Sequence, residues 1–130
     1  MMYKYKEITE KIISCAFKVY NNLGFGFLEK IYKKAMIIEL KKEGLQVVEE
    51  SKIEVHYEGE IIGEYYADLL VEDKVIVELK STKDSNEAYE KQLINYLKAT
   101  DMEVGLLINF GEKEVEVSRK IYDNMLKKVL

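Results

Sequence analysis

Charged side chains stand inside one of the most apolar stretches of the sequence, "YYADLLVEDKVIVELKS" at residues 65–81. Asp68, Glu78 and Lys80 lie there in two runs that otherwise have the character of strands, which are depleted in Asp, Glu and Lys. Glu78 and Lys80 are two residues apart on one strand, so their side chains leave the same face of a sheet. This placement indicates chemistry rather than packing.

Whether Asp68 joins these two side chains depends on the register of the predicted hairpin. A loop of three residues, 72–74, would pair Val71 with Val75, although this loop has no glycine for its left-handed position. Asp68 would then stand opposite Glu78, whereas a loop of two residues would turn Glu78 to the other face. The apolar residues occupy both faces and do not decide between the registers. On chemical grounds we favour the loop of three residues.

Two carboxylates held side by side repel each other unless a cation lies between them or one of them is protonated. Mg²⁺ prefers hard oxygen ligands and is commonly bound by one or two carboxylates, waters and phosphate oxygens. A neighbouring lysine can orient or deprotonate water, or balance charge in the transition state. The set therefore indicates metal-assisted phosphodiester hydrolysis. The E-x-K spacing alone carries no such information, because it recurs at Glu39/Lys41, Glu50/Lys52 and Glu72/Lys74.

Four segments resemble, in the same order, the characteristic segments of the small GxxExxY proteins of the PD-(D/E)XK nuclease superfamily. They are "GFLEKIY" at 26–32, "ADLLVEDKVIVELKS" at 67–81, "QLINYLKAT" at 92–100 and "VGLLINFG" at 104–111. The resemblance covers nearly the whole chain. It implies a restriction-endonuclease-like αβββαβ core and a Mg²⁺- or Mn²⁺-dependent nuclease acting on DNA or RNA.

The same resemblance implies a role for each matching residue. The metal ligands would be Asp68, Glu78 and the backbone carbonyl of Leu79, with Glu29 reaching the metal from a helix. The catalytic residues would be Lys80, Glu29 and Gln92, and Tyr96 would bind substrate. Two positions depart from the pattern: Ala67 replaces the superfamily's Pro, and Tyr89 stands where a histidine is common.

Each helical assignment also has a structural alternative. Glu29 fits a first-turn acid that the helix dipole favours. Tyr32 and Tyr96, at helical spacing, fit core aromatics better than ligands, and Gln92 could satisfy backbone groups. A non-catalytic nucleic-acid- or protein-binding module on the same fold therefore remains the alternative function. A homodimer or a protein partner suits either function, because a minimal core leaves little surface for specificity.

The periodicity predicts the elements that must position these residues. Helices are expected at Tyr5–Tyr20, at Leu28–Glu43 with Gly44 as its stop, at 85–100 capped by Ser85, and at Arg119–Leu130. Strands are expected as a three-stranded meander over 46–80 with turns at 58–59 and 72–74, as a buried strand at 103–110, and as a short edge strand at 114–117. The order ααβββαββα predicts an α/β or α+β sandwich around one mixed sheet.

Composition bounds the remaining possibilities. The 130 residues predict one domain, 1–130, and the net charge of −4 argues against bulk coating of nucleic acid. Cys15 is the only cysteine and His56 the only histidine, which predicts a reducing cytoplasmic location and excludes a zinc site of the usual kind. No apolar run is long enough to span a membrane, so no membrane partner is expected.

Overall fold

Two helices begin the part of the chain that the computed structural model describes, residues 4–130. They are α1 (Lys6–Leu23) and α2 (Glu29–Lys42). Gly24 ends α1 in a left-handed conformation, with φ of +69°, and its N–H donates to the Tyr20 carbonyl at 2.8 Å. Gly44 ends α2 with φ of +78°, as predicted. The expectation of a single domain over 1–130 includes residues 1–3, which lie outside the described residues.

The buried side of α2 is narrower than the sequence suggested. Tyr32, Met36 and Leu40, spaced by four residues, are buried on it. Leu28 and Ile38, two apolar residues of the segment predicted as a helix, are 67% and 57% exposed. The helix therefore packs through one row of side chains and leaves a second apolar row in solvent.

Six strands follow in one mixed sheet whose spatial order is the order of the chain. The remaining elements are β1 (Val47–Tyr57), β2 (Glu60–Val71), β3 (Val75–Lys80), α3 (Glu87–Lys98), β4 (Val104–Phe110), β5 (Val115–Asp123) and β6 (Lys128–Val129). β3 and β4 run parallel with α3 as their connection, and the other neighbours are antiparallel. The predicted αβββαβ core and mixed sheet are confirmed.

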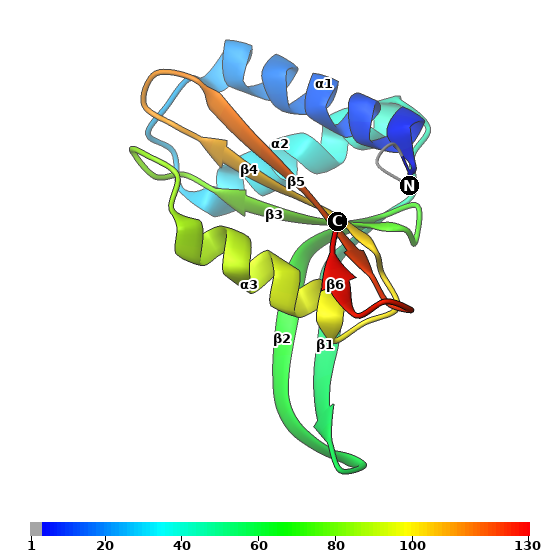
Figure 1. Ribbon diagram of the computed structural model, residues 1–130. Helices are drawn as coiled ribbons and strands as arrows, with labels where there is room; N and C mark the ends of the chain where they lie inside the picture. Colours follow the sequence, from blue (N-terminus) through cyan, green and yellow to red (C-terminus); the bar gives the residue numbers. More distant parts are fainter. Residues whose placement is uncertain (1–3) are drawn as a thin grey trace.

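The helices cover both faces of the sheet (Figure 1). α1 and α2 lie on one face, over a core that includes Leu69, Val77, Leu106 and Phe110. α3 lies on the opposite face and packs Leu93, Tyr96 and Leu97 against a smaller core. Every residue of β4 is buried, which agrees with the aliphatic run predicted for a covered strand. Within residues 4–130, no helix has the length and apolar character required to cross a membrane.

β1 and β2 form a long ribbon that extends past the rest of the sheet, below α3 in the view of Figure 1. β2 pairs with β3 only from Leu69 to Val71, whereas it pairs with β1 over almost its whole length. We call residues 51–67, which run through the tip of this ribbon, the hairpin arm. Its tip is the predicted turn at Glu58 and Gly59, where φ is +52° and +81°.

The turn between β2 and β3 has the three-residue loop that the chemistry favoured. Val71 pairs with Val75, and the Lys74 N–H donates to the Val71 carbonyl at 3.0 Å. Glu72 and Asp73 both have left-handed backbones, with φ of +55° and +57°. The loop thus forms without a glycine, at the cost of some backbone strain at these two residues.

The predicted C-terminal helix, Arg119–Leu130, is wrong. Those residues continue β5 to Asp123 and then form β6. Along β5, Val115 and Ile121 pack into the core of the α1/α2 face, whereas Met125 is 92% exposed. The apolar residues of this segment therefore do not form one buried stripe, as an amphipathic helix would require. Asp123 reverses the chain, because its Oδ1 accepts the N–H groups of Met125 and Leu126 at 2.9 Å.

The predicted cap of α3, Ser85, is also wrong, by one residue. Asn86 is the N-cap, with an extended backbone, and its side chain accepts the Ala88 N–H at 2.7 Å. Both residue types cap helices well, so the sequence alone did not distinguish them.

Candidate active site

Asp68 and Glu78 meet at the point where β2 separates from β3. The last backbone pair is Leu69 with Val77, so Asp68 and Glu78 occupy the next position of the register. There the Asp68 N–H donates to Glu78 Oε2 at 2.7 Å, and the Leu79 N–H donates to Asp68 Oδ2 at 2.8 Å. The two carboxylates thus replace the ladder bonds that the diverging strands no longer make.

Burial makes this pair of acids electrostatically unusual. Glu78 is 6% exposed, and burial together with the adjacent Asp68 carboxylate raises its pKa from 4.5 to about 8. Burial also raises the pKa of Asp68, an effect that the Leu79 N–H and the charges of Lys33 and Lys80 oppose. Perturbed carboxylates of this kind gather at functional sites. The pair therefore favours a shared proton or a bound cation.

Each carboxylate keeps one oxygen outside these hydrogen bonds. Within residues 4–130, Asp68 Oδ1 and Glu78 Oε1 accept no hydrogen bond, although Glu78 is buried. Two hard oxygen donors are then available from adjacent strands. Carboxylate oxygens are hard donors of the kind that Mg²⁺ prefers, so the pair could contribute ligands to a divalent metal.

A cavity of about 220 Å³ adjoins Asp68 on the side of α2. Asp68 and Leu79 line it together with Glu29, Lys30 and Lys33. Glu29, the first residue of α2, is exposed and lines this cavity with Asp68, and its role at a metal stays a prediction. Within residues 4–130, no group of three or more Asp, Glu, His or Cys side chains is arranged so that it could hold a metal ion.

Sequence reasoning missed two residues of this site, Lys33 and Glu50. They form an ion pair, and the side chain of Lys33 is only 14% exposed. Lys33 lies one helical turn after Glu29, so helical spacing alone could have placed it on the same face. Glu50 lies on β1 between the residues that pair with Leu69 and Ala67, and it has a left-handed φ of +53°, which no sequence pattern indicated.

Lys80 ends β3 beside the two acids. Its Nζ lies 4.8 Å from the centre of the Tyr89 ring, the position where a histidine was common in the resembling proteins. Thr82, two residues after Lys80, is held by the Asn109 side chain. Asn109 Oδ1 accepts the Thr82 N–H at 2.9 Å, and Asn109 Nδ2 donates to the Thr82 carbonyl at 3.0 Å. Asn109 is fully buried, so this amide anchors the strand end that carries Lys80.

Gln92 and Tyr96 lie on the side of α3. Both line a cavity of about 310 Å³, and the Tyr96 ring lies 5.4 Å from that of Tyr65 on the hairpin arm. Burial, followed by the negative charge of Glu78, raises the pKa of Tyr96 to about 12. The predicted site residues thus line cavities on two sides of the sheet. Glu29 lines the cavity beside α2, and Gln92 and Tyr96 line the cavity beside α3.

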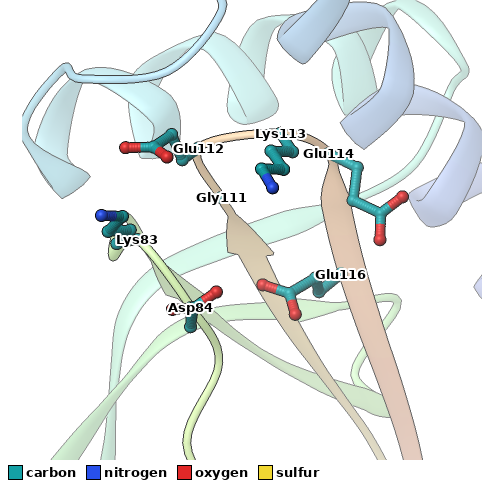
Figure 2. A pocket seen from close by; sticks show the side chains of 7 residues that line it. All are labelled: Lys83, Asp84, Gly111, Glu112, Lys113, Glu114 and Glu116. Carbon is teal, nitrogen blue, oxygen red and sulfur yellow. The ribbon is translucent and has the colours of Figure 1, made fainter.

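Another cavity, of about 310 Å³, lies at the end of the sheet where β3 and β4 finish (Figure 2). Lys83 and Asp84 border it from the loop after β3, and Glu112, Lys113 and Glu116 border it from the β4–β5 turn and β5. None of the predicted metal-binding, catalytic or substrate-binding residues lines this cavity. The candidate active site is therefore the one at Asp68 and Glu78, not this cavity.

Comparison with known proteins identifies the family of the chain. The family model of the PD-(D/E)XK nuclease superfamily matches residues 6–121. The narrower resemblance to the GxxExxY proteins is not tested by this match and stays a prediction. Neither the curated proteins nor the solved structures include a significant match to the chain. The match spans nearly all of the elements described above, and the chain belongs to the PD-(D/E)XK nuclease superfamily, with its restriction-endonuclease-like fold.

Proposed function

We propose that the chain is a metal-dependent nuclease, a single domain that hydrolyses phosphodiester bonds in DNA or RNA with Mg²⁺ or Mn²⁺. The observation that carries this proposal is the pair of half-buried Asp68 and buried Glu78, each with a raised pKa and one uncommitted oxygen. Members of the superfamily generally use divalent metals and act on nucleic acid. Membership alone gives the fold, and these two acids supply the argument for chemistry.

The donor set fits a divalent metal. Asp68 and Glu78 would hold it with the Leu79 carbonyl, and Glu29 would contribute from across the cavity of about 220 Å³, directly or through water. Mg²⁺ needs only one or two protein carboxylates, because waters and phosphate oxygens complete its octahedron. When bound, such a metal lowers the pKa of a coordinated water and stabilises negative charge on the phosphate.

The other residues have roles that follow from their positions. Lys80, half-exposed beside both acids, would orient the attacking water and balance charge on the phosphate, while the Tyr89 ring holds its ammonium group. Gln92 can donate hydrogen bonds to a phosphate from the cavity on the α3 side. Tyr96 forms the wall of that cavity, and its hydroxyl stays protonated at neutral pH.

Calorimetric titration of Mn²⁺ into wild type and Glu78→Ala, with a cleavage assay on mixed DNA and RNA, tests the proposal. Glu58→Ala, in the exposed turn at the tip of the hairpin arm, is the matched control for loss of a carboxylate. We expect saturable binding and cleavage in wild type and in the control, both lost in Glu78→Ala. Metal binding without cleavage would favour the non-catalytic binding module, and no metal binding would contradict the proposal.

A second variant separates metal binding from chemistry. Lys80→Met keeps the length of the side chain and removes its charge. Because Lys80 is not among the proposed ligands, we expect Mn²⁺ to bind with unchanged stoichiometry while cleavage falls by about a hundredfold or more, the usual effect of removing a group that stabilises charge in the transition state. Equal cleavage by the two proteins would remove Lys80 from the mechanism.

A further inference from the structure

A groove runs between α3 and the hairpin arm, on the side of the sheet opposite α2. Two cavities compose it, of about 460 Å³ and 310 Å³, and they share Tyr65, Asn95 and Tyr96 in their walls. The larger adds Lys98 and the smaller adds Lys91 and Gln92. We call this surface the arm groove.

The charge of the arm groove is opposite to that of the chain. The chain has 24 acidic residues and a net charge of −4, yet neither cavity has an Asp or Glu in its wall. Lys91 and Lys98 are exposed and make no ion pair within residues 4–130. Lysines of this kind bind phosphates as point charges, and the amides of Gln92 and Asn95 add hydrogen-bonding groups that suit base edges.

The groove also contains an aromatic surface. Tyr65 is 47% exposed, and its ring rests against the buried ring of Tyr96 at 5.4 Å between centres. Tyr65 therefore has little freedom to move away from a ligand, and part of its ring stays open to the groove. Bases that are not held in a duplex stack on such rings, whereas a double helix keeps its base faces inside the stack.

The groove lies near the candidate active site, although Asp68 and Glu78 line neither of its cavities. The charges of Glu78 and Asp68 both act on the Tyr96 hydroxyl, and Tyr96 is a wall of both cavities. A strand lying in the groove would therefore pass from Lys98 and Tyr65 to Gln92 and on to the two acids. No other described cavity joins exposed aromatic surface, uncommitted lysines and amides in this way.

We propose that the arm groove binds single-stranded nucleic acid, with Tyr65 stacking on a base and with Lys91 and Lys98 contacting phosphates. This inference rests on the proposed function for its biological sense, since it names the form of substrate that would reach the metal site. Its physical content is separate, because binding in the groove needs no metal.

Fluorescence anisotropy in EDTA tests the groove without chemistry. The probes are labelled 12-nucleotide oligothymidine and oligouridine and a 12-base-pair DNA duplex. The test variant is Tyr65→Ala, and Tyr66→Ala is its matched control, because Tyr66 is the next residue on β2, points to the other face and is 51% exposed. Tyr65→Phe keeps the ring, and Lys91→Ala/Lys98→Ala removes both charges.

We expect wild type to bind a single strand more tightly than the duplex. Tyr65→Ala should weaken binding about tenfold, in line with the loss of one stacked base, while Tyr65→Phe and Tyr66→Ala stay within about twofold. The double lysine variant should lower the slope of log K against log salt by about 1.4, or 0.7 for each phosphate that a lysine no longer neutralises. Circular dichroism confirms that each variant is folded.

Three outcomes would overturn the proposal: no binding of either single strand, preference for the duplex, or equal losses in Tyr65→Ala and Tyr66→Ala. If the groove binds a protein segment instead of nucleic acid, we expect the first of these outcomes, no binding of either single strand. Failure of the metal site is distinguishable, because Mn²⁺ titration would then fail while single-strand binding in EDTA persisted, also in Glu78→Ala. Failure of the groove alone would leave Mn²⁺ binding intact.

Discussion

Replacing Glu78 by Gln should remove a pH dependence from the stability of the metal-free protein. The pKa of Glu78 is raised from 4.5 to about 8, so between these values the folded protein holds a proton that the unfolded chain has released. Stability from this group is complete below pH 4.5, falls as the pH rises, and is lost above pH 8. Gln cannot titrate, yet its side-chain oxygen can still accept the Asp68 N–H.

The magnitude follows from the number of protons. Where one proton separates the two states, the free energy of unfolding changes by about 1.4 kcal/mol for each pH unit. Between pH 5.5 and 7.5 the folded protein is mostly protonated at Glu78 and the unfolded chain mostly ionised. The free energy of unfolding of wild type, relative to Glu78→Gln, should therefore fall by about 2 kcal/mol over this interval.

Urea denaturation in EDTA, followed by far-ultraviolet circular dichroism at half-unit steps of pH, measures this difference. The control is Glu58→Gln, which removes a carboxylate from an exposed turn and changes the net charge equally. We expect the control to run parallel to wild type at all pH values. A constant difference between wild type and Glu78→Gln from pH 5.5 to 7.5 would refute the reasoning, because Glu78 would then be ionised in both states.

Three further substitutions test how the scaffold holds the site. Tyr32→Phe removes a buried hydroxyl that donates to the Gly24 carbonyl, so urea denaturation should show a loss of about 1–2 kcal/mol. Gly105→Ala would place a Cβ 2.7 Å from Leu93 Cδ1 and should cost about 1–3 kcal/mol, partly restored by adding Leu93→Val; additive losses would contradict this. Asp73→Gly relieves a φ of +57° in the β2–β3 turn and should raise the thermal midpoint, with a gain of about 0.5–1 kcal/mol, whereas Asp73→Asn should change nothing.

The pairing of the two acids could be predicted from the sequence because side-chain chemistry supplied what periodicity did not. Asp68 and Glu78 were placed opposite each other by assuming a loop of three residues, and the register of Val71 with Val75 bears out that assumption. The ion pair of Lys33 and Glu50 was not predicted. It depends on a left-handed residue inside β1, and local sequence does not specify such a conformation.

The fold was predictable where burial and periodicity agree and not where apolar residues are exposed. β4 is buried throughout, and its aliphatic run was interpreted correctly. The prediction of a helix in the C-terminal segment was wrong because it treated the apolar residues there as one buried stripe, whereas Met125 and Leu126 are exposed to solvent. A sequence gives the spacing of apolar residues but not which surfaces a neighbouring element will cover.

The way β2 leaves β3 divides the sheet into parts of unequal stability. The strands of the hairpin arm form backbone pairs only with each other, and a two-stranded hairpin by itself is marginally stable in water. Its amides should therefore exchange with deuterium long before those of β4, through a local opening that leaves the core folded. Asp68 belongs to the strand that opens and Glu78 to the strand that stays. The hydrogen bonds from backbone N–H groups to the Asp68 and Glu78 carboxylates thus mark the boundary at which this local opening stops.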